Sequence, residues 1–216
     1  MTAKKKRSKI DWLNHFVGFI SVLAGVLIAF GLNNWNESRK ERRIIQSVLV
    51  NIQDEVKRNN ERLDAAYGEN KKIHDTLGGY LQLLDDTMEP NAPLDTLRKF
   101  QSANSAFISA DLESVSFSFE LFQLSNVAWR TAERTNILSA MDYDLVHDLA
   151  FIYDFQTKLD RFDEKITDEI SRMASYSDSK QDWRRMLKDV NTALTFSEVL
   201  KRQYNEALET MEDHME

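Results

Sequence analysis

Hydrophobic residues in this chain form one unbroken run near the start, followed by long stripes with helical spacing. Residues 16–32 carry no charge, and Ser21 is their only polar side chain. At a rise of ~1.5 Å per residue a helix of this length is roughly 26 Å long. Adding residues 13–15 brings it near the ~20 residues that a bilayer core requires. Trp12 and Trp35 bracket the run, as indoles do at both membrane interfaces. The pattern predicts a transmembrane helix with its interfaces over residues 12–37.

Two other structures fit part of this pattern. A cleaved signal peptide has a basic start, an apolar stretch and a small-residue exit, and residues 29–31 resemble a cleavage site. The run is longer than the ~7–15 apolar residues usual in a signal peptide. A buried core helix seldom lacks a polar stripe over such a length. We therefore favour the membrane anchor over both alternatives.

The next segment, residues 38–84, repeats apolar residues in alternating steps of four and three, which is a helical stripe. We expect the helix to be interrupted or bent near Gly68 and to stop within residues 78–93. The stripe fits either a coiled-coil seam between protomers or, as we favour, a face packed on other helices of the chain. Its members are Ile45, Leu49, Ile52, Val56, Leu63, Ile73, Leu77, Tyr80 and Leu84, with Asn59, Ala66 and Asn70 at its weaker slots.

The middle of the chain predicts shorter elements. Residues 85–93 contain both prolines and form the clearest loop. We expect a short helix over residues 94–107, and a second one through Arg134 capped by Ser125. Residues 115–121 alternate with the period of a strand but have no partner strand in the sequence. They predict an extended connector that packs Phe117 and Phe119 inward.

Two long stripes complete the chain, and a polar break at residues 175–180 separates them. We expect Asp142 to cap the first helix, and the two helices to form an antiparallel hairpin. The first inward set is Leu145, Leu149, Ile152, Leu159, Ile166, Ile170 and Met173. The second is Trp183, Leu187, Val190, Leu194, Leu200, Tyr204, Leu208 and Met211. The predicted fold is all-α: one N-terminal transmembrane helix, then a long-helix bundle with an antiparallel C-terminal hairpin.

Charge divides the chain between a basic anchor and an acidic body. Residues 1–43 hold nine of the 28 basic and three of the 35 acidic residues. We expect a basic cytoplasmic tail (1–11), the transmembrane helix and interface (12–37), a juxtamembrane helix (38–84) and a helical bundle domain (85–216) that packs with it. Basic residues flank the span almost equally, and the short tail favours a cytoplasmic N-terminus with the bulk of the chain periplasmic. An acidic body disfavours nucleic acid as a partner, whereas basic flanks suit an anionic bilayer surface.

No arrangement of residues predicts a catalytic, cofactor or metal site. The chain has no cysteine, and its six glycines form no phosphate-binding loop. Asp144 and His147 have the spacing of half a di-iron site, but no second such pair exists, so we expect both on the surface. Five acids cluster without EF-hand spacing, and a solvated face explains them: Asp160, Asp163, Glu164, Asp168 and Glu169. We therefore expect a protein that is not an enzyme and needs no cofactor.

The span carries the clearest interaction signal. Ser21, Gly25 and Ala29 are four residues apart and share one helix face. Small residues allow another helix to approach closely in lipid. This predicts contact with other transmembrane helices, from a second copy or from subunits of a membrane complex.

The end of the span has a recognisable motif. Residues 28–40 read I-A-F-G-L-N-N-W-N-E-S-R-K, which resembles the span exit I-A-x-x-x-N-N-W-N-E-x-R-K of a family of uncharacterised bacterial single-span membrane proteins. The stretch from Ala128 and Trp129 to Leu138 is similar to a second landmark of that family, with Asn136 where many members have Gly. The resemblance implies a bacterial envelope protein with a helical domain, and it assigns no activity, because none is established for the family.

These observations predict a single-pass, membrane-anchored helical interaction or accessory protein of a bacterial envelope assembly. An extracytoplasmic ligand-sensing module is the first alternative, and it would show a polar-lined cavity in the bundle. An uncharacterised enzyme is the second, and it would show titratable residues converging in a cleft.

Overall fold

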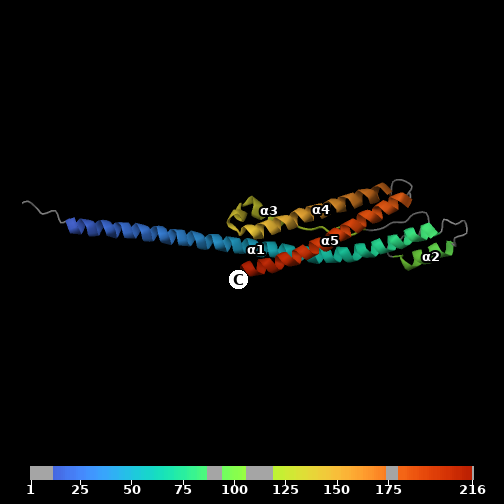
Figure 1. The fold of residues 1–216 in the computed structure, drawn as a ribbon, viewed down its shortest axis with the longest axis horizontal. Coiled ribbons are helices and arrows are strands. Elements are labelled where there is room, and N and C mark those ends of the chain that lie inside the picture. Colours follow the sequence, from blue (N-terminus) through green and yellow to red (C-terminus); the bar gives the residue numbers. More distant parts are fainter. Residues whose placement is uncertain (1–11, 87–93, 106–118, 174–179, 216) are drawn as a thin grey trace, which may run out of the picture. The chain divides into compact units, whose positions relative to one another are not determined.

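The computed structural model describes residues 12–86, 94–105, 119–173 and 180–215. In chain order the elements are α1 (Trp12–Asp86), α2 (Leu94–Ala103), α3 (Val127–Arg134), the 3₁₀ helix η1 (Ile137–Ala140), α4 (Tyr143–Met173) and α5 (Lys180–Met215). Figure 1 shows these helices coloured along the chain. The described residues contain no strand, so the predicted all-α class is confirmed.

The chain forms two compact units, residues 1–47 and 48–216. The first unit contains the N-terminal part of α1. The second unit is a helical bundle that contains the remainder of α1 together with α2, α3, α4 and α5. Each unit has a different distribution of apolar side chains, which remain exposed in the first and form a core in the second.

The stripe predicted after the span is the contribution of α1 to this core. Its predicted members between Leu49 and Leu77, including both asparagines, are at most 3% exposed. Ile45 and Tyr80 are only partly covered, and the side chain of Leu84 lies outside the described residues. Because these side chains are buried within one chain, the intramolecular alternative is the one the fold adopts. The buried apolar members are Leu49, Ile52, Val56, Leu63, Ala66, Ile73 and Leu77.

The interruption predicted near Gly68 is wrong, because α1 continues through Gly68, Gly78 and Gly79. No glycine in the described part of the chain has a positive φ, so these residues adopt ordinary helical geometry. Packing on the bundle outweighs the ~1 kcal/mol cost of a glycine inside a helix. Gly79 also allows α2 to approach, since a Cβ there would lie 3.1 Å from the Phe100 ring. The helix ends at Asp86, inside the predicted interval.

Helices α4 and α5 form the predicted antiparallel hairpin (Figure 1). The carboxylate of Asp142 caps α4 as expected, accepting the N–H groups of Asp144 at 3.0 Å and Leu145 at 3.1 Å. Most predicted inward residues of both helices are buried, whereas Ile170, Leu187 and Leu208 are only partly covered. The side chain of Met173 lies outside the described residues. The buried residues of α5 also include five outside the predicted set: Met186, Asp189, Ala193, Ser197 and Ala207.

The middle of the chain differs in detail from its prediction. Helix α2 ends at Ala103, and residues 106–118, which include Phe117, lie outside the described part. Residues 119–126 have no regular secondary structure, and Phe119 packs edge-on against buried Phe122 with ring centroids 6.1 Å apart. The N-cap of α3 is Asn126 rather than Ser125, and its side chain makes no capping bond. Asn136 adopts a left-handed conformation at φ 56°, which accounts for the turn after α3.

Candidate functional site

The apolar run occupies the first unit of the chain. One helix among the described residues is long and apolar enough to span a membrane, and it lies near the N-terminus. None of its apolar window is buried, so this is an exposed helix and not a core helix. Trp12 and Trp35 are 73% and 57% exposed, at the two ends of the run. An uncovered apolar surface of this extent is typical of a helix that another apolar phase or partner covers.

None of the described residues covers the predicted small-residue face. A Cβ placed on Gly25 would meet no atom within 4 Å, and Ser21 and Ala29 are exposed. The Ser21 hydroxyl donates to the carbonyl oxygen of Val17 at 2.8 Å. That bond satisfies the only polar side chain of the run inside its own helix, which suits a lipid-facing or helix-facing position.

In the second unit, the buried carboxylate of Glu55 on α1 takes the place of a cap for α3. Its Oε2 accepts the Ser125 hydroxyl at 2.7 Å and the Ala128 N–H at 2.9 Å. Its Oε1 accepts the Tyr153 hydroxyl at 2.8 Å and, more weakly, the Trp129 N–H at 3.4 Å. The first turn of a helix presents unpaired N–H groups and positive potential, so an anion from another helix stabilises it.

The same contact fixes two aromatic rings. The rings of Trp129 and Tyr153 stack at 5.2 Å with 13° between their planes. Burial and the neighbouring Glu55 charge raise the pKa of Tyr153, so its hydroxyl remains a donor. With four donors on two oxygens, Glu55 has a complete structural role and no free lone pair directed at a substrate.

Asparagine side chains on α1 hold the irregular segment 119–126. Asn59 pairs with Ser125 through two bonds, Nδ2 to the carbonyl oxygen at 2.7 Å and the backbone N–H to Oδ1 at 2.8 Å. Asn70, eleven residues later on the same face, pairs with Glu120 in the same manner at 2.7 and 2.8 Å. Each amide therefore replaces the partner strand that the segment lacks.

Helices α4 and α5 complete the support of this segment. The Gln156 amide nitrogen donates to the Ser125 carbonyl at 3.0 Å, and its oxygen accepts the Tyr204 hydroxyl at 2.9 Å. The Asp163 carboxylate accepts the Phe122 N–H at 2.8 Å. Its other oxygen is buried and has no hydrogen-bond partner among the described residues. Burial, offset in part by backbone hydrogen bonds, raises the pKa of Asp163 to about 7.

Asp163 also corrects the prediction of a solvated acidic face. Four members of that set are partly or fully exposed, but Asp163 is 8% exposed and serves the core. Asp144 and His147 lie at the surface as expected, with His147 Nδ1 3.5 Å from Asp148 Oδ1. In the described ranges no three His, Asp or Glu side chains are grouped to hold a metal ion.

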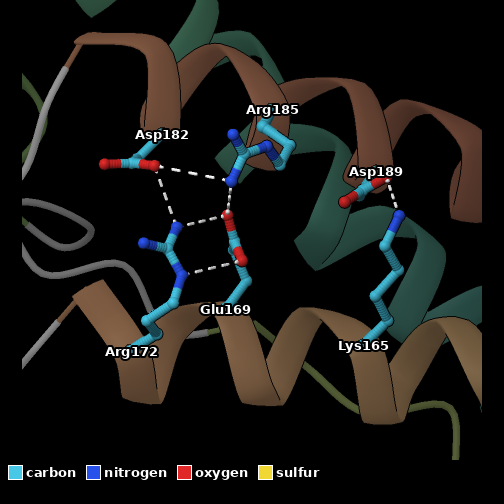
Figure 2. A network of polar contacts seen from close by, with 6 residues as sticks. All are labelled: Lys165, Glu169, Arg172, Asp182, Arg185 and Asp189. Atoms are coloured by element: carbon cyan, nitrogen blue, oxygen red, sulfur yellow. Dashed lines mark hydrogen bonds and ion pairs between the residues drawn. The ribbon is translucent and has the colours of Figure 1, made fainter.

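An ion-pair network joins α4 to α5 near the hairpin tip (Figure 2). Arg172 donates to Glu169 at 2.7 Å and to Asp182 at 2.9 Å, and Arg185 contacts both acids at 3.4 and 3.6 Å. A separate pair joins Lys165 to Asp189 at 2.7 Å. The hydrogen bond from Arg172 lowers the pKa of Glu169. These pairs match the two helices in register, and their charges are already compensated, so we assign them a structural role.

A groove lies between α1 and the first turns of α3. Its volume is about 460 Å³, within the range of small-molecule sites. Apolar atoms come from Val48, Val127, Ala128 and Ala132, and polar groups from Asn51, Glu55, Arg58, Asn59, Arg62, Ser125 and Thr131. Arg58 and Arg62 donate to the backbone carbonyls of Asp54 and Gln123, and neither has an ion-pair partner in the described part of the chain.

Sequence reasoning missed the groups that organise the body, although two of them were visible in the pattern. Asn59 and Asn70 interrupt an apolar stripe at equivalent slots, and polar residues at such slots require a buried partner. Glu55 and Asp163 gave no such signal, because their partners are remote backbone groups. No protein-family model, curated protein or solved structure matches this chain.

Proposed function

We propose that the protein is a single-pass, membrane-anchored helical interaction or accessory subunit of a bacterial envelope assembly, without enzymatic activity. The observation that carries the proposal is the exposed apolar run of α1, because no described residue of its own unit covers it. Water does not tolerate a surface of this extent, whereas a bilayer does. In this proposal the lipid bilayer and other transmembrane helices are the partners.

The helical bundle favours a role in protein interaction over a role in catalysis. Its buried polar groups Glu55, Asn59 and Asn70 are occupied by backbone partners of the same chain. Such groups fix the shape of a surface rather than bind a reacting molecule. We place the N-terminus in the cytoplasm and the bulk of the chain in the periplasm, as the basic residues before the span favour.

Alkaline carbonate extraction tests the anchor. The full chain should remain in the membrane pellet, since hydrophobic insertion withstands conditions that remove peripheral proteins. Recovery in the supernatant contradicts the proposal. Fusing alkaline phosphatase or a fluorescent protein to the C-terminus tests orientation, because the phosphatase is active only outside the cytoplasm. Phosphatase activity without fluorescence is the expected outcome.

The groove beside α3 favours a second candidate function, the sensing of a small anion. Two guanidinium groups without carboxylate partners line a cleft of about 460 Å³ in an acidic chain. Thermal shift of the full chain in neutral detergent tests this with octanoate and inorganic phosphate as probes. A stabilisation that disappears in Arg58→Gln/Arg62→Gln but persists in the neighbouring Lys57→Gln supports sensing. No shift with either probe removes this candidate.

A further inference from the structure

The helix turns that follow the apolar run place their arginines and their glutamates on opposite faces, with Lys40 between the two. At ~100° per residue, Trp35, Arg39, Arg42 and Arg43 lie within an arc of about 100°, which we call the exit face. Glu37 and Glu41 lie on the opposite side by the same spacing. All of these side chains are exposed.

Two side-chain contacts show that this separation is built into the helix. The Arg39 guanidinium lies 4.7 Å from the centre of the Trp35 ring, over its face. On the other side of the helix, Glu37 accepts a hydrogen bond from Asn33 at 3.1 Å. The acid is thus held by an amide, whereas the arginine is held by an aromatic face that leaves its N–H donors free.

The arginines of the exit face have no acidic partner of their own. Within the described residues, Arg39, Arg42 and Arg43 form no ion pair, although Glu37 and Glu41 are close in sequence. A planar guanidinium matches phosphate through paired hydrogen bonds. An indole next to it favours the headgroup depth of a bilayer.

We propose that the exit face binds the phosphate groups of anionic phospholipids at the end of the span where the body begins. The inference rests on the proposed membrane anchor and deepens it by naming the lipid class and the residues. In this arrangement Trp35 sets the depth of the helix at the headgroups, and Arg39, stacked on it, presents N–H donors to phosphate. Arg42 and Arg43 extend the positive face by one helical turn. Repulsion keeps the Glu37 and Glu41 side away from the same headgroups.

Electron spin resonance with spin-labelled lipids tests this on the full chain reconstituted in phosphatidylcholine vesicles. We expect spin-labelled phosphatidylglycerol to associate several-fold more strongly than spin-labelled phosphatidylcholine. The variant Arg39→Gln/Arg42→Gln/Arg43→Gln should lose most of that preference. An unchanged preference in this variant overturns the proposal. The basic tail is the same in all variants, so the difference reports on the exit face.

A charge-exchange variant distinguishes the effect of the exit face from the effect of total charge. Glu37→Arg/Arg39→Glu keeps composition and net charge but disperses the face and removes the contact with Trp35. Loss of preference in this variant supports the proposal, and wild-type behaviour overturns it. Adding inorganic phosphate at constant ionic strength should displace no lipid, and displacement overturns the assignment to a headgroup. Only protein that resists carbonate extraction is reconstituted. If the proposed membrane anchor is wrong, the protein is therefore lost at the extraction and never reaches the lipid measurement.

Discussion

The side-chain amide of Asn59 pairs with both backbone groups of Ser125, at 2.7 Å to the carbonyl oxygen and 2.8 Å from the N–H. This is the pattern that a neighbouring strand would supply, made instead by one residue of a helix. Asn70 repeats it at Glu120, so two amides hold the ends of the irregular segment 119–126 against α1. The segment carries Phe122 into the core, where it is 1% exposed.

Replacing Asn59 by alanine should lower the free energy of unfolding by about 2 kcal/mol, because the Ser125 N–H then has no partner in a covered position. Chemical denaturation of the full chain in detergent, followed by circular dichroism, measures the change. Asn60→Ala is the matched control: its amide bonds Asn205 on the exposed side of the bundle, and it should cost less than about 0.5 kcal/mol. Equal losses in both variants contradict the pairing role.

Replacing Glu55 by glutamine should cost about 2–3 kcal/mol, because an amide nitrogen would face groups that are themselves donors. The fluorescence of Trp129 should change with stability, since its helix loses its anion and its ring is stacked on Tyr153. Glu61→Gln, at an exposed position of the same helix, should stay within about 0.5 kcal/mol of the wild type. A Glu55→Gln protein as stable as the wild type would remove the trans-capping role.

Stability should depend on pH through Asp163. Its folded-state pKa of about 7 lies above the ordinary value of 3.8, so the folded state holds this proton more tightly than the unfolded state. The contribution is full below about pH 4, falls as pH rises, and is lost above pH 7. Asp163→Asn keeps an oxygen for Phe122 and removes the charge. Its melting temperature should exceed that of the wild type at pH 8 and approach it at pH 5. Parallel pH profiles for the two proteins contradict this prediction.

Replacing Gly25 by leucine should weaken association through the span, since a large side chain prevents close approach of a second helix. Val26→Leu is the control, because it places the same leucine side chain on the adjacent face of the helix. Cross-linking in membranes or a membrane two-hybrid assay measures the loss, and circular dichroism verifies that the bundle remains folded. If both variants associate equally well, the contact lies elsewhere, with the stripe over residues 45–56 as the next segment to test.

The sequence alone determined the helices and most of the core. Apolar spacing identified the inward faces of α1, α4 and α5, because burial of a stripe with helical period depends on local geometry that the sequence displays directly. The cap at Asp142 followed for the same reason, since its partners are two and three residues away. The apolar run could also be recognised from the sequence, because length and absence of charge are properties of a contiguous segment.

Only the tertiary structure decided how the irregular segment is held and where buried charge is tolerated. Glu55 finds its partners some 70 residues away, and Asp163 binds Phe122 across 41 residues, so no local pattern could indicate either contact. The unbroken course of α1 through Gly68 was decided in the same way. Glycine weakens a helix by about 1 kcal/mol, and burial of the flanking Leu63 and Ile73 exceeds that cost. Local propensity is small compared with packing, and packing exists only once distant segments meet.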